Sequence, residues 1–574
     1  MQKIIQRRTL PTTCHLPKDF HPVLKRVLAA RHIDTFDELD YSLPRLQPYT
    51  LLKDIDKAVH LLYNALKQQM RILIIADYDA DGATSCAVAV KTLKLMGAQH
   101  VNYLVPNREE HGYGLSEVLV KLALQSRPNL LITVDNGISS FSGVALAKQY
   151  GIQVLITDHH LPAKQLPSAD AIVNPNQTGD LFPSKMLAGV GVIFYVMMAL
   201  RAYLREQGWF SAQQLTEPNL ANLLDLVALG TVADVVPLDY NNRILVDQGL
   251  RRIRAGQCCY GIQALLAAAK RDASQMTTTD LSFGIAPRLN AAGRMDDMRH
   301  GIACLLSENY NLAHEHAQLL EVFNHERRAV ESDMQQEAEN MLSIMTLEKQ
   351  TDLPIGLCLY DENWHKGVIG LLASRIKERL ARPVIVFTNA GNGQIVGSAR
   401  SVAHVHIKNV LDSIAIQYPK IFIKYGGHAM AAGLTLHHHD FELFKTVFNH
   451  EVQQYISIED LQNIVLSDGL LTDSDFTLNL ASQLRTITPW GQGFAEPIFD
   501  GEFTILDKQL FKNKHLKMKV KPIEGSNIVE VMAFNLTETS WLNEIDQVKL
   551  AYKLDINSFR GFQNLCLTAE CVIW

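Results

Sequence analysis

The chain has few cysteines, and none lies in a pattern that binds zinc or builds a disulfide framework. Its eight cysteines are spread over 574 residues without a CxxC pair, and the only close pair, Cys258 and Cys259, is adjacent. This usage is typical of a reducing compartment. The N-terminus lacks the apolar core of a signal peptide, and no apolar stretch is long enough to span a bilayer. We therefore expect a cytoplasmic protein with no membrane association.

The chain also lacks an excess of positive charge. Its net charge is −6, with 54 lysines and arginines against 60 aspartates and glutamates. This balance argues against a globally basic nucleic-acid-binding surface, although a local basic groove remains compatible with it. No internal repeat and no low-complexity linker occurs. With 574 residues, 47% of them hydrophobic, the chain is too long for one ordinary domain and predicts three to four.

The order of apolar and polar segments predicts an α/β protein with five parts. Expected strands at 71–76, 101–106, 130–135 and 154–158 alternate with expected helices at 84–98, 115–125 and 142–151. This alternation is typical of a doubly wound parallel sheet. Residues 311–342 contain few helix breakers and predict a long connecting helix. The expected parts are an N-terminal helical lead-in (1–45), a catalytic α/β domain (46–250), a helical connector (251–345), a second, smaller α/β domain (346–455) and a C-terminal β-barrel of the OB type (456–574).

Four acidic or histidine-containing islands follow apolar runs of the first α/β domain. They are DYDADG (77–82), VDNG (134–137), DHH (158–160) and ADVV (233–236), after runs at 71–76, 130–134, 154–157 and 223–233. We interpret each run as a parallel strand, so that the islands converge at the carboxyl edge of one sheet, where ligands bind. Carboxylates with imidazole suit Mn²⁺ or Mg²⁺ better than a closed zinc site. The sequence leaves the choice between these two ions open.

The three aspartates of DYDADG indicate a cation. Carboxylates packed this closely after an apolar strand repel one another unless a cation neutralises them. An ordinary turn rich in Asp and Gly is the alternative. An EF-hand calcium loop is excluded, because the position that needs a glutamate is Val88. Together with the other islands, the loop predicts a site for two metal ions, the arrangement that many phosphodiester hydrolases use.

These islands resemble the DHH phosphoesterases. DYDADGATS, VDNG, DHH, ADVVPL and GGHAMAAG occur in the order of that family, and PNREEHGYGLS, PRLNAAGRM and TPWGQGFAEPIF are similar to its exonucleases specific for single strands. The resemblance runs from about residue 46 to past 500. It implies a metal-dependent enzyme that degrades single-stranded DNA from the 5′ end to mononucleotides in repair and recombination. It also implies a monomer that works with a single-strand-binding protein and a helicase.

The resemblance also implies roles for single residues. The expected metal ligands, with Asp135 as the bridge, are Asp79, Asp81, Asp135, His159 and Asp234. Asp77 would bind or tune the first ion. His160 would donate a hydrogen bond to the scissile phosphate, and Asp158 would orient a histidine.

Substrate contacts are expected from the segments between and beyond the islands. The turn of Gly426, Gly427 and His428 is interpreted as a phosphate site before a helix. Arg108, Ser398 and Arg400 are predicted to bind a terminal 5′-phosphate, since arginine suits that group, and Tyr113 to stack on a base. Asn290 and Arg294 would either reach phosphate or brace the floor of the active site, and the sequence does not decide between these roles.

The last part of the chain carries a run of alternate lysines. Residues Lys512, Lys514, Lys517, Lys519 and Lys521 are interleaved with Phe511, His515 and Met518. Basic residues beside aromatic ones suit a single-stranded backbone with stacked bases. The alternative is an edge strand protected by its lysines.

Two other classes of protein share parts of this pattern. A small-substrate hydrolase of the same chemistry would need only the two α/β domains, so the additional segments favour a polymer. A non-catalytic nucleic-acid scaffold would not need a complete acidic cluster, because unused carboxylates destabilise a fold.

Overall fold

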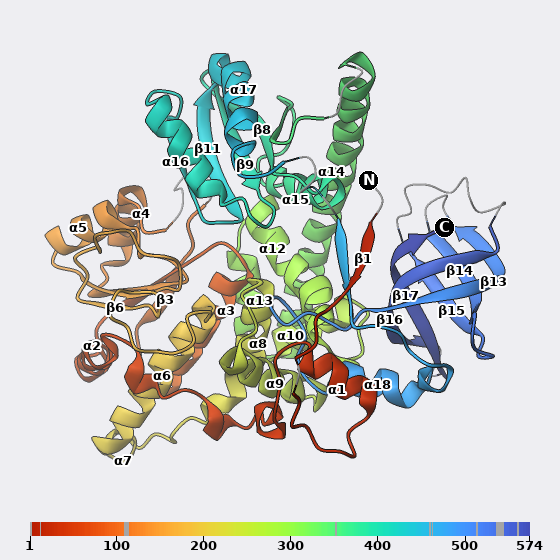
Figure 1. Ribbon diagram of the computed structural model, residues 1–574. Coiled ribbons are helices and arrows are strands. Elements are labelled where there is room, and N and C mark those ends of the chain that lie inside the picture. Colours follow the sequence, from red (N-terminus) through yellow and green to blue (C-terminus); the bar gives the residue numbers. More distant parts are fainter. Residues whose placement is uncertain are drawn as a thin grey trace. The chain divides into compact units, whose positions relative to one another are not determined.

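The computed structural model describes residues 3–11, 13–107, 114–349, 353–457, 461, 463–511, 515–534, 545–559 and 562–574. The chain forms two compact units (Figure 1). The larger contains Arg7–Asn324 and Ser467–Glu570, and the smaller is built around His325–Leu466. Among the residues described, no helix has both the length and the apolar character needed to cross a membrane.

A five-stranded parallel sheet forms the centre of the larger unit. Its strand order is β3-β2-β4-β5-β6, with β3 (Val101–Leu104), β2 (Ile72–Ala76), β4 (Leu130–Val134), β5 (Gln153–Thr157) and β6 (Ala171–Val173). The residues of β2 and β4 are all buried, as expected for apolar strands covered on both faces. The direction of strand addition reverses between β2 and β4, which creates a topological switch point there. The predicted doubly wound parallel sheet is confirmed.

Helices cover both faces of this sheet. On one face, side chains of α4 (Glu117–Ala123) and α5 (Phe141–Gln149) pack against Leu73, Ile75 and Leu131. Helices α3 (Ala80–Leu95) and α6 (Gly189–Glu206) contact the strands as well as each other. The remaining helices of this part are α1 (Pro22–Ala29), α2 (Ile55–Lys67), α7 (Trp209–Ala212), α8 (Leu224–Ala233) and α9 (Tyr240–Arg254).

The apolar run 223–233 is a helix, so its interpretation as a strand was wrong. Residues Leu224–Ala233 form α8, which packs against α3, α6 and α9 and is buried on every side. A helix that is apolar all round has no amphipathic period, and its sequence therefore cannot be told from that of a buried strand. Asp234 thus lies at the C-cap of a helix and not at the end of a strand.

The predicted long helix is confirmed as α14 (Tyr310–Lys349), which has 40 residues. It follows the shorter helices α10 (Tyr260–Ala268), α11 (Thr278–Asp280), the π-helical turn η7 (Leu281–Ile285), α12 (Ala286–Met295) and α13 (Arg299–Leu306). Arg288 of α12 forms an ion pair with Glu321 of α14. This pair joins the helix that carries PRLNAAGRM to the first half of α14.

The C-terminal part is a closed five-stranded barrel, as predicted for an OB-type fold. Its order is β13-β14-β15-β17-β16, with β13 (Phe499–Phe511), β14 (His515–Pro522), β15 (Val529–Ala533), β17 (Phe562–Ile573) and β16 (Gln547–Phe559). The helix α18 (Leu478–Thr486) precedes it. Strands β15 and β17 pair in parallel, while β14 pairs with both β13 and β15.

The strand that carries these lysines, β14, is therefore paired with a neighbouring strand on each side, and the edge-strand alternative was wrong. Lys517, Lys519 and Lys521 alternate with buried residues along β14, and Lys517 pairs with Glu530 at 2.8 Å. Met518 is buried in the barrel, on the face opposite the lysines, because side chains of a strand alternate between faces. Lys512 and Lys514 lie outside the described residues.

The described part of the smaller unit contains a mixed five-stranded sheet, the second half of α14 and further helices. The sheet order is β10-β11-β9-β8-β7, with β10 (Lys424–Gly427), β11 (Ala431–His437), β9 (Gln394–Arg400), β8 (Val384–Gly391) and β7 (Leu357–Tyr360). The further helices include α15 (Ile369–Leu380), α16 (Ile407–Gln417) and α17 (Phe441–Val452). A separate two-stranded sheet joins β1 (Ile4–Arg7) to β12 (Ile464–Ser467).

The glycine-rich segment 426–433 does not precede a helix, contrary to the interpretation from the sequence. It forms the turn of the antiparallel hairpin β10–β11, where the His428 N–H donates to the carbonyl of Ala431 at 2.8 Å. A hairpin turn has no helix dipole, so the expected helix N-terminal phosphate site is absent from this described segment.

Candidate metal centre

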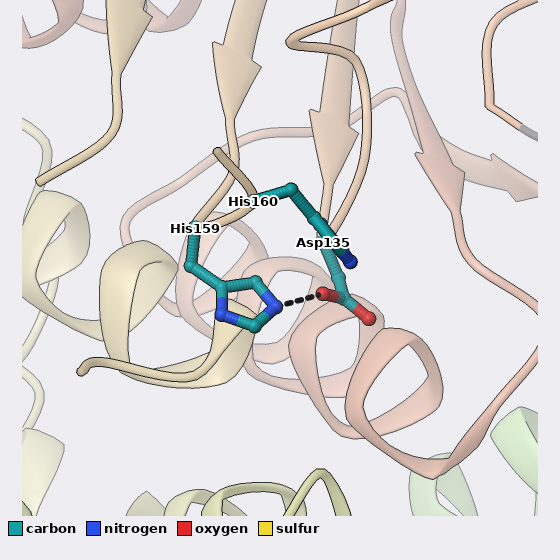
Figure 2. A group of neighbouring side chains, drawn as sticks. All are labelled: Asp135, His159 and His160. Carbon is teal, nitrogen blue, oxygen red and sulfur yellow. Dashed lines mark ion pairs between the residues drawn. The ribbon is translucent and has the colours of Figure 1, made fainter. Parts of the chain in front are cut away.

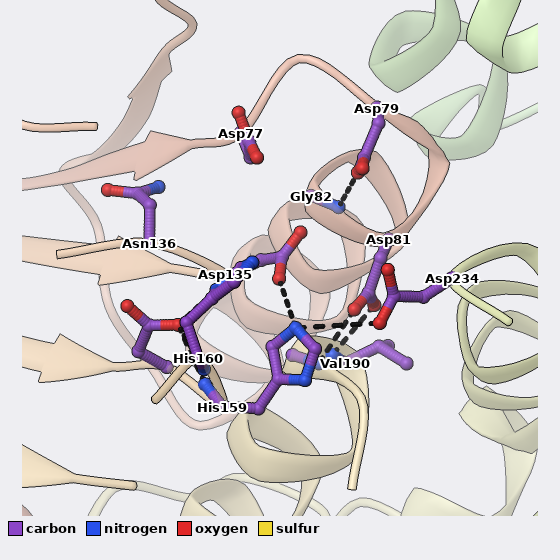
Figure 3. A network of polar contacts seen from close by, with 12 residues as sticks. Asp77, Asp79, Asp81, Gly82, Asp135, Asn136, His159, His160, Val190 and Asp234 are labelled. Carbon is purple, nitrogen blue, oxygen red and sulfur yellow. Dashed lines mark hydrogen bonds and ion pairs between the residues drawn. The ribbon is translucent and has the colours of Figure 1, made fainter. Parts of the chain in front are cut away.

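Polar residues follow four neighbouring strands at the carboxyl edge of the parallel sheet. Asp77 follows β2, Asp135 follows β4, Asp158 follows β5 and Asn174 follows β6. Figure 3 shows the carboxylates of DYDADG together with Asp135, Asp234 and His159 at this edge. The convergence of the four islands at one site is therefore as predicted, although Asp234 reaches it from a helix end.

Each aspartate of DYDADG accepts a hydrogen bond from a different backbone N–H group, which orients its carboxylate. Asp79 caps α3 and accepts from Gly82 N at 3.0 Å. Asp81 is buried, and its two oxygens accept from Gly189 N and Val190 N at 2.7 and 2.9 Å, at the N-terminus of α6. The positive end of that helix stabilises the carboxylate. Asp77 accepts from Tyr78 N at 2.8 Å.

His159 lies between carboxylates from different islands. Its Nε2 is 3.2 Å from Asp135 Oδ1 (Figure 2) and 3.5 Å from Asp234 Oδ2. Three groups of side chains have ligand atoms close enough to hold a metal ion: Asp81, His159 and Asp234; Asp135, His159 and His160; and Asp77, Asp79 and Asp135. Asp135 and His159 each belong to two of these groups.

Burial and mutual repulsion make the carboxylates costly to ionise. Burial and the neighbouring Asp234 raise the pKa of Asp81 to about 7, and burial and Asp79 raise the pKa of Asp234 to about 7. Burial and Asp81 raise the pKa of Asp135 well above its usual range. Burial and the adjacent His160 lower the pKa of His159, which keeps its imidazole neutral. A neutral imidazole surrounded by crowded carboxylates is the donor set that a divalent cation stabilises.

Asp158 orients the loop that carries both histidines. Its Oδ1 accepts from the backbone N–H groups of His159 and His160 at 2.7 and 3.0 Å and contacts His160 Nδ1 at 2.7 Å. Although burial opposes both shifts, this contact lowers the pKa of Asp158 to about 2 and raises the pKa of His160 to about 9. The His160 ring is therefore protonated at neutral pH and can donate to an anion.

Two asparagines donate hydrogen bonds to the backbone of the loop that carries His159 and His160. Neither was predicted from the sequence. Asn174 Nδ2 donates to the His160 carbonyl at 2.9 Å, and Asn176 Nδ2 donates to the His159 carbonyl at 2.7 Å. Both follow β6. The sequence does contain a pattern that could have indicated them. The short apolar run AIV is followed by the polar segment NPN, as the other apolar runs are followed by the acidic islands.

Glycine at two positions allows helices to approach the acidic residues closely. A Cβ on Gly189 would lie 2.6 Å from the Asp135 Cβ, and a Cβ on Gly230 would lie 2.2 Å from Thr84 Oγ1. Neither position tolerates a side chain without moving the neighbouring residues. The packing of α6 and α8 thus sets the positions of the carboxylates.

Asn290 contacts the backbone of the acidic loop, a contact that a brace would make. Its Oδ1 accepts from Ala80 N at 2.8 Å, in the first turn of α3. Helix α12 also lies close to the loop, because a Cβ on Gly293 would be 1.9 Å from the Tyr78 carbonyl oxygen. Asn290 therefore caps the helix that carries Asp81.

Asn290→Ala is expected to lower the free energy of unfolding by about 1 kcal/mol, the usual cost of losing a helix cap. The activity of the site would fall with it, because the loop of Asp79 and Asp81 loses its support. Asn290→Asp keeps an acceptor at the same place and is the matched control. Urea unfolding and activity of both variants test this; equal losses in the two would contradict the brace.

Of the remaining predicted substrate residues, some lie on described elements and two lie outside the described residues. Ser398 and Arg400 lie on β9 in the smaller unit, where Arg400 Nη1 donates to Ser398 Oγ at 3.1 Å. Arg294 lies in the last turn of α12. Gly426, Gly427 and His428 form the hairpin described above. Arg108 and Tyr113 lie outside the described residues.

The parallel sheet with this acidic and histidine cluster defines a protein of the DHH family. The model of the DHH family, N-terminal domain, matches residues 71–231, and the DHHA1 domain matches 354–454. The RecJ OB domain matches residues 467–570.

Whole-chain comparisons narrow the family further. The chain is 49% identical to the single-stranded-DNA-specific exonuclease RecJ of Salmonella typhimurium over 98% of both chains, and 48% identical to that of Escherichia coli over 98% of this chain and 97% of the relative. The crystal structure of RecJ in complex with Mn²⁺ from Thermus thermophilus superposes with a TM-score of 0.78 at 28% identity, covering 96% of this chain and 76% of that one. Its counterpart with Mg²⁺ gives a TM-score of 0.72 at 27% identity, covering 96% and 74%. The chain belongs to the RecJ family of the DHH superfamily.

Proposed function

We propose that the protein is a metal-dependent exonuclease that hydrolyses single-stranded DNA from the 5′ end to mononucleotides, in DNA repair and recombination. The observation that carries this proposal is the convergence of five aspartates and His159 at the switch point of the sheet, in a chain of the RecJ family. The RecJ relatives are named as exonucleases specific for single-stranded DNA.

Two divalent ions fit the residues present. The residues that would hold them are Asp79, Asp81, Asp135, His159 and Asp234, and Asp77 belongs to one of the same groups. An oxygen-rich set with one imidazole accepts both Mn²⁺ and Mg²⁺. When bound, such ions would activate water for attack on phosphorus and neutralise the leaving oxygen.

The protein's own contribution is to hold the reacting groups in place. Asp158 keeps the protonated His160 ring oriented, so that it can donate a hydrogen bond to a non-bridging oxygen of the scissile phosphate. The N–H groups at the start of α6 hold Asp81, and Asn290 holds the start of α3. These contacts are made before substrate arrives, which lowers the cost of reorganisation during the reaction.

The polarity of degradation is proposed to come from Ser398 and Arg400. Both side chains leave the same face of β9, next to the first turn of α15, where a Cβ on Gly370 would lie 2.9 Å from Ser398 Oγ and 3.0 Å from Arg400 Nη2. A hydroxyl, a guanidinium and a helix N-terminus are suited to a terminal 5′-phosphate. Arg108 and Tyr113 are proposed to contact the substrate as well.

The setting in the cell is also a proposal. The expected partners besides DNA are a single-strand-binding protein and a helicase that supplies unwound strand, with the enzyme itself a monomer. All eight cysteines are free thiols, which supports a reducing cytoplasm.

The direct test uses single-stranded DNA labelled at either end, with Mn²⁺ or with EDTA. We expect mononucleotides to be released from the 5′ end only, in Mn²⁺ only, and faster when that end carries a phosphate. Release from the 3′ end would overturn the polarity. Hydrolysis of dinucleotides without degradation of the polymer would replace the proposal with a small-substrate hydrolase, and tight binding without hydrolysis would indicate a scaffold.

Metal affinity is expected to rise with pH. Below about pH 7 the raised pKa values keep Asp81 and Asp234 protonated, so protons compete with the cation, and above it both are ionised. The dissociation constant for Mn²⁺ should therefore fall by at least ~10-fold between about pH 6 and about pH 8. Without metal, the free energy of unfolding changes with pH in the opposite direction. The folded state holds these protons more tightly than the unfolded state, so the free energy of unfolding falls as pH rises through about 7.

Titration calorimetry in buffers of different ionisation enthalpy measures both the affinity and the protons released. The increase in melting temperature on adding Mn²⁺ should also be larger at the higher pH. A dissociation constant independent of pH, with no proton release, would contradict this prediction.

A further inference from the structure

A pocket of about 140 Å³ lies beside the acidic cluster in the larger unit. Three segments form it: the end of α8, the helical segment 278–283 and the segment 490–496 that precedes β13. Val232 and Val235 line it on either side of Asp234 in sequence, and Asp234 Oδ2 is 3.5 Å from His159 Nε2. Residues that line the pocket are therefore sequence neighbours of Asp234, a candidate metal ligand.

Two of its apolar side chains are exposed in unusual backbone settings. Phe283 is 67% exposed and lies in the π-helical turn η7, an irregularity that is frequent at functional sites. Val235 is 61% exposed and has a φ of 60°, in the left-handed region that β-branched residues rarely adopt. Backbone strain of this kind is concentrated at active sites and ligand-binding sites.

The polar groups of the pocket suit a base better than a phosphate. Thr278, Thr279, Ser282 and Gln492 offer hydroxyl and amide groups. Of the described residues that line the pocket, none is lysine, arginine or histidine, and the charge of Glu496 is balanced by Lys553 at 2.7 Å. The volume is below the roughly 300–1,000 Å³ of sites for whole small molecules, so a single ring system is the better match.

We propose that this pocket binds one nucleobase of the single strand, on the 3′ side of the scissile phosphodiester, with Phe283 as the stacking surface. The segment that forms one wall leads into β13, the first strand of the barrel. We infer that single-stranded DNA held by both the metal centre and the barrel runs along this wall. The inference rests on the proposed exonuclease function, for which it adds a subsite.

The test compares Phe283→Ala, Phe283→Trp and the wild type on oligonucleotides that carry one abasic position, moved stepwise from the 5′ end. Removing a stacked base or its aromatic partner weakens binding about 5- to 100-fold. We expect KM to rise by about 10-fold in Phe283→Ala, with kcat changed little, and Phe283→Trp to restore it. In the wild type one abasic position should cause a similar loss, and in Phe283→Ala that position should cause no further loss.

Binding of a labelled strand in EDTA, measured by fluorescence anisotropy, gives the same comparison without turnover. Tyr150→Ala is the matched control, because Tyr150 is 57% exposed and lies before β5, at the opposite edge of the sheet. Unchanged KM and binding in Phe283→Ala, with an active wild type, would overturn the subsite alone. Equal losses on every abasic position would also overturn it, whereas a wild type inactive on all single strands would overturn the exonuclease proposal instead.

Discussion

Asp135→Asn is expected to abolish nucleotide release from single-stranded DNA, with a fall in kcat on the order of 10³-fold or more. Asp135 belongs to two of the three groups that could hold a metal ion, and its Oδ1 lies 3.2 Å from His159 Nε2. Asparagine has the same shape but no charge, so it replaces an anionic ligand with a neutral, weaker one. The backbone is held in the left-handed region at φ 62°, which asparagine tolerates well.

Melting temperatures of Asp135→Asn and the wild type show whether the variant loses activity because it binds metal less well or because it folds less stably. Without metal, Asp135→Asn is expected to be at least as stable as the wild type, because one buried carboxylate with a raised pKa is removed. Added Mn²⁺ should then raise its melting temperature less than it raises that of the wild type. Asp170→Asn, which changes a carboxylate just before β6 at the opposite edge of the sheet, is the matched control and should stay active. An Asp135→Asn variant with more than about a tenth of the wild-type kcat would contradict the shared-ligand role.

His160→Gln is expected to lower kcat about 10²- to 10³-fold while KM changes little, the usual effect of removing a donor to a developing charge. The wild type should lose activity as pH rises through about 9, because there the ring loses the proton that Asp158 stabilises. This alkaline limb should be missing from the pH profile of His160→Gln. Asp158→Asn should move it to lower pH, since the raised pKa of His160 depends on that carboxylate.

The pH profile distinguishes this role from a structural one. A change that only loosened the loop would lower activity at every pH and leave the alkaline limb in place. His60→Gln changes an exposed histidine on α2 and is the control for the substitution itself. If His160→Gln keeps the alkaline limb, another group is responsible for it.

The positions of the acidic islands could be predicted because parallel strands order their ends. Asp77, Asp135 and Asp158 follow runs of apolar residues too short for helices, so sequence and topology lead to the same edge. Asp234 was placed in the right cluster by the pattern of islands but on the wrong element, because the run before it is apolar on all sides. The contacts of Asn174 and Asn176 depend on the pairing of β6 with β5, which periodicity alone does not specify.

The pairing of strands in the barrel could not be predicted from the sequence either. Its closure depends on parallel pairing of β15 with β17, between residues more than thirty positions apart. Nothing local in KHLKMKVK distinguishes an internal strand from an edge strand. The hairpin at Gly426–Gly433 is similar, since the same glycines can begin a helix or close a turn, and the partner strand decides.

The brace made by Asn290 has a consequence for the timing of synthesis. Asn290 and Ala80 are 210 residues apart, and Asn290 lies beyond residues 71–231, which match the family's N-terminal domain. At about 5–20 residues per second, a ribosome needs roughly 10–40 s to reach it after Ala80. During that interval the sheet can fold, but the loop of Asp79 and Asp81 has no cap from α12. The nascent chain therefore emerges with an incomplete metal centre, and a nuclease able to degrade single strands is assembled only when the chain is more than half made.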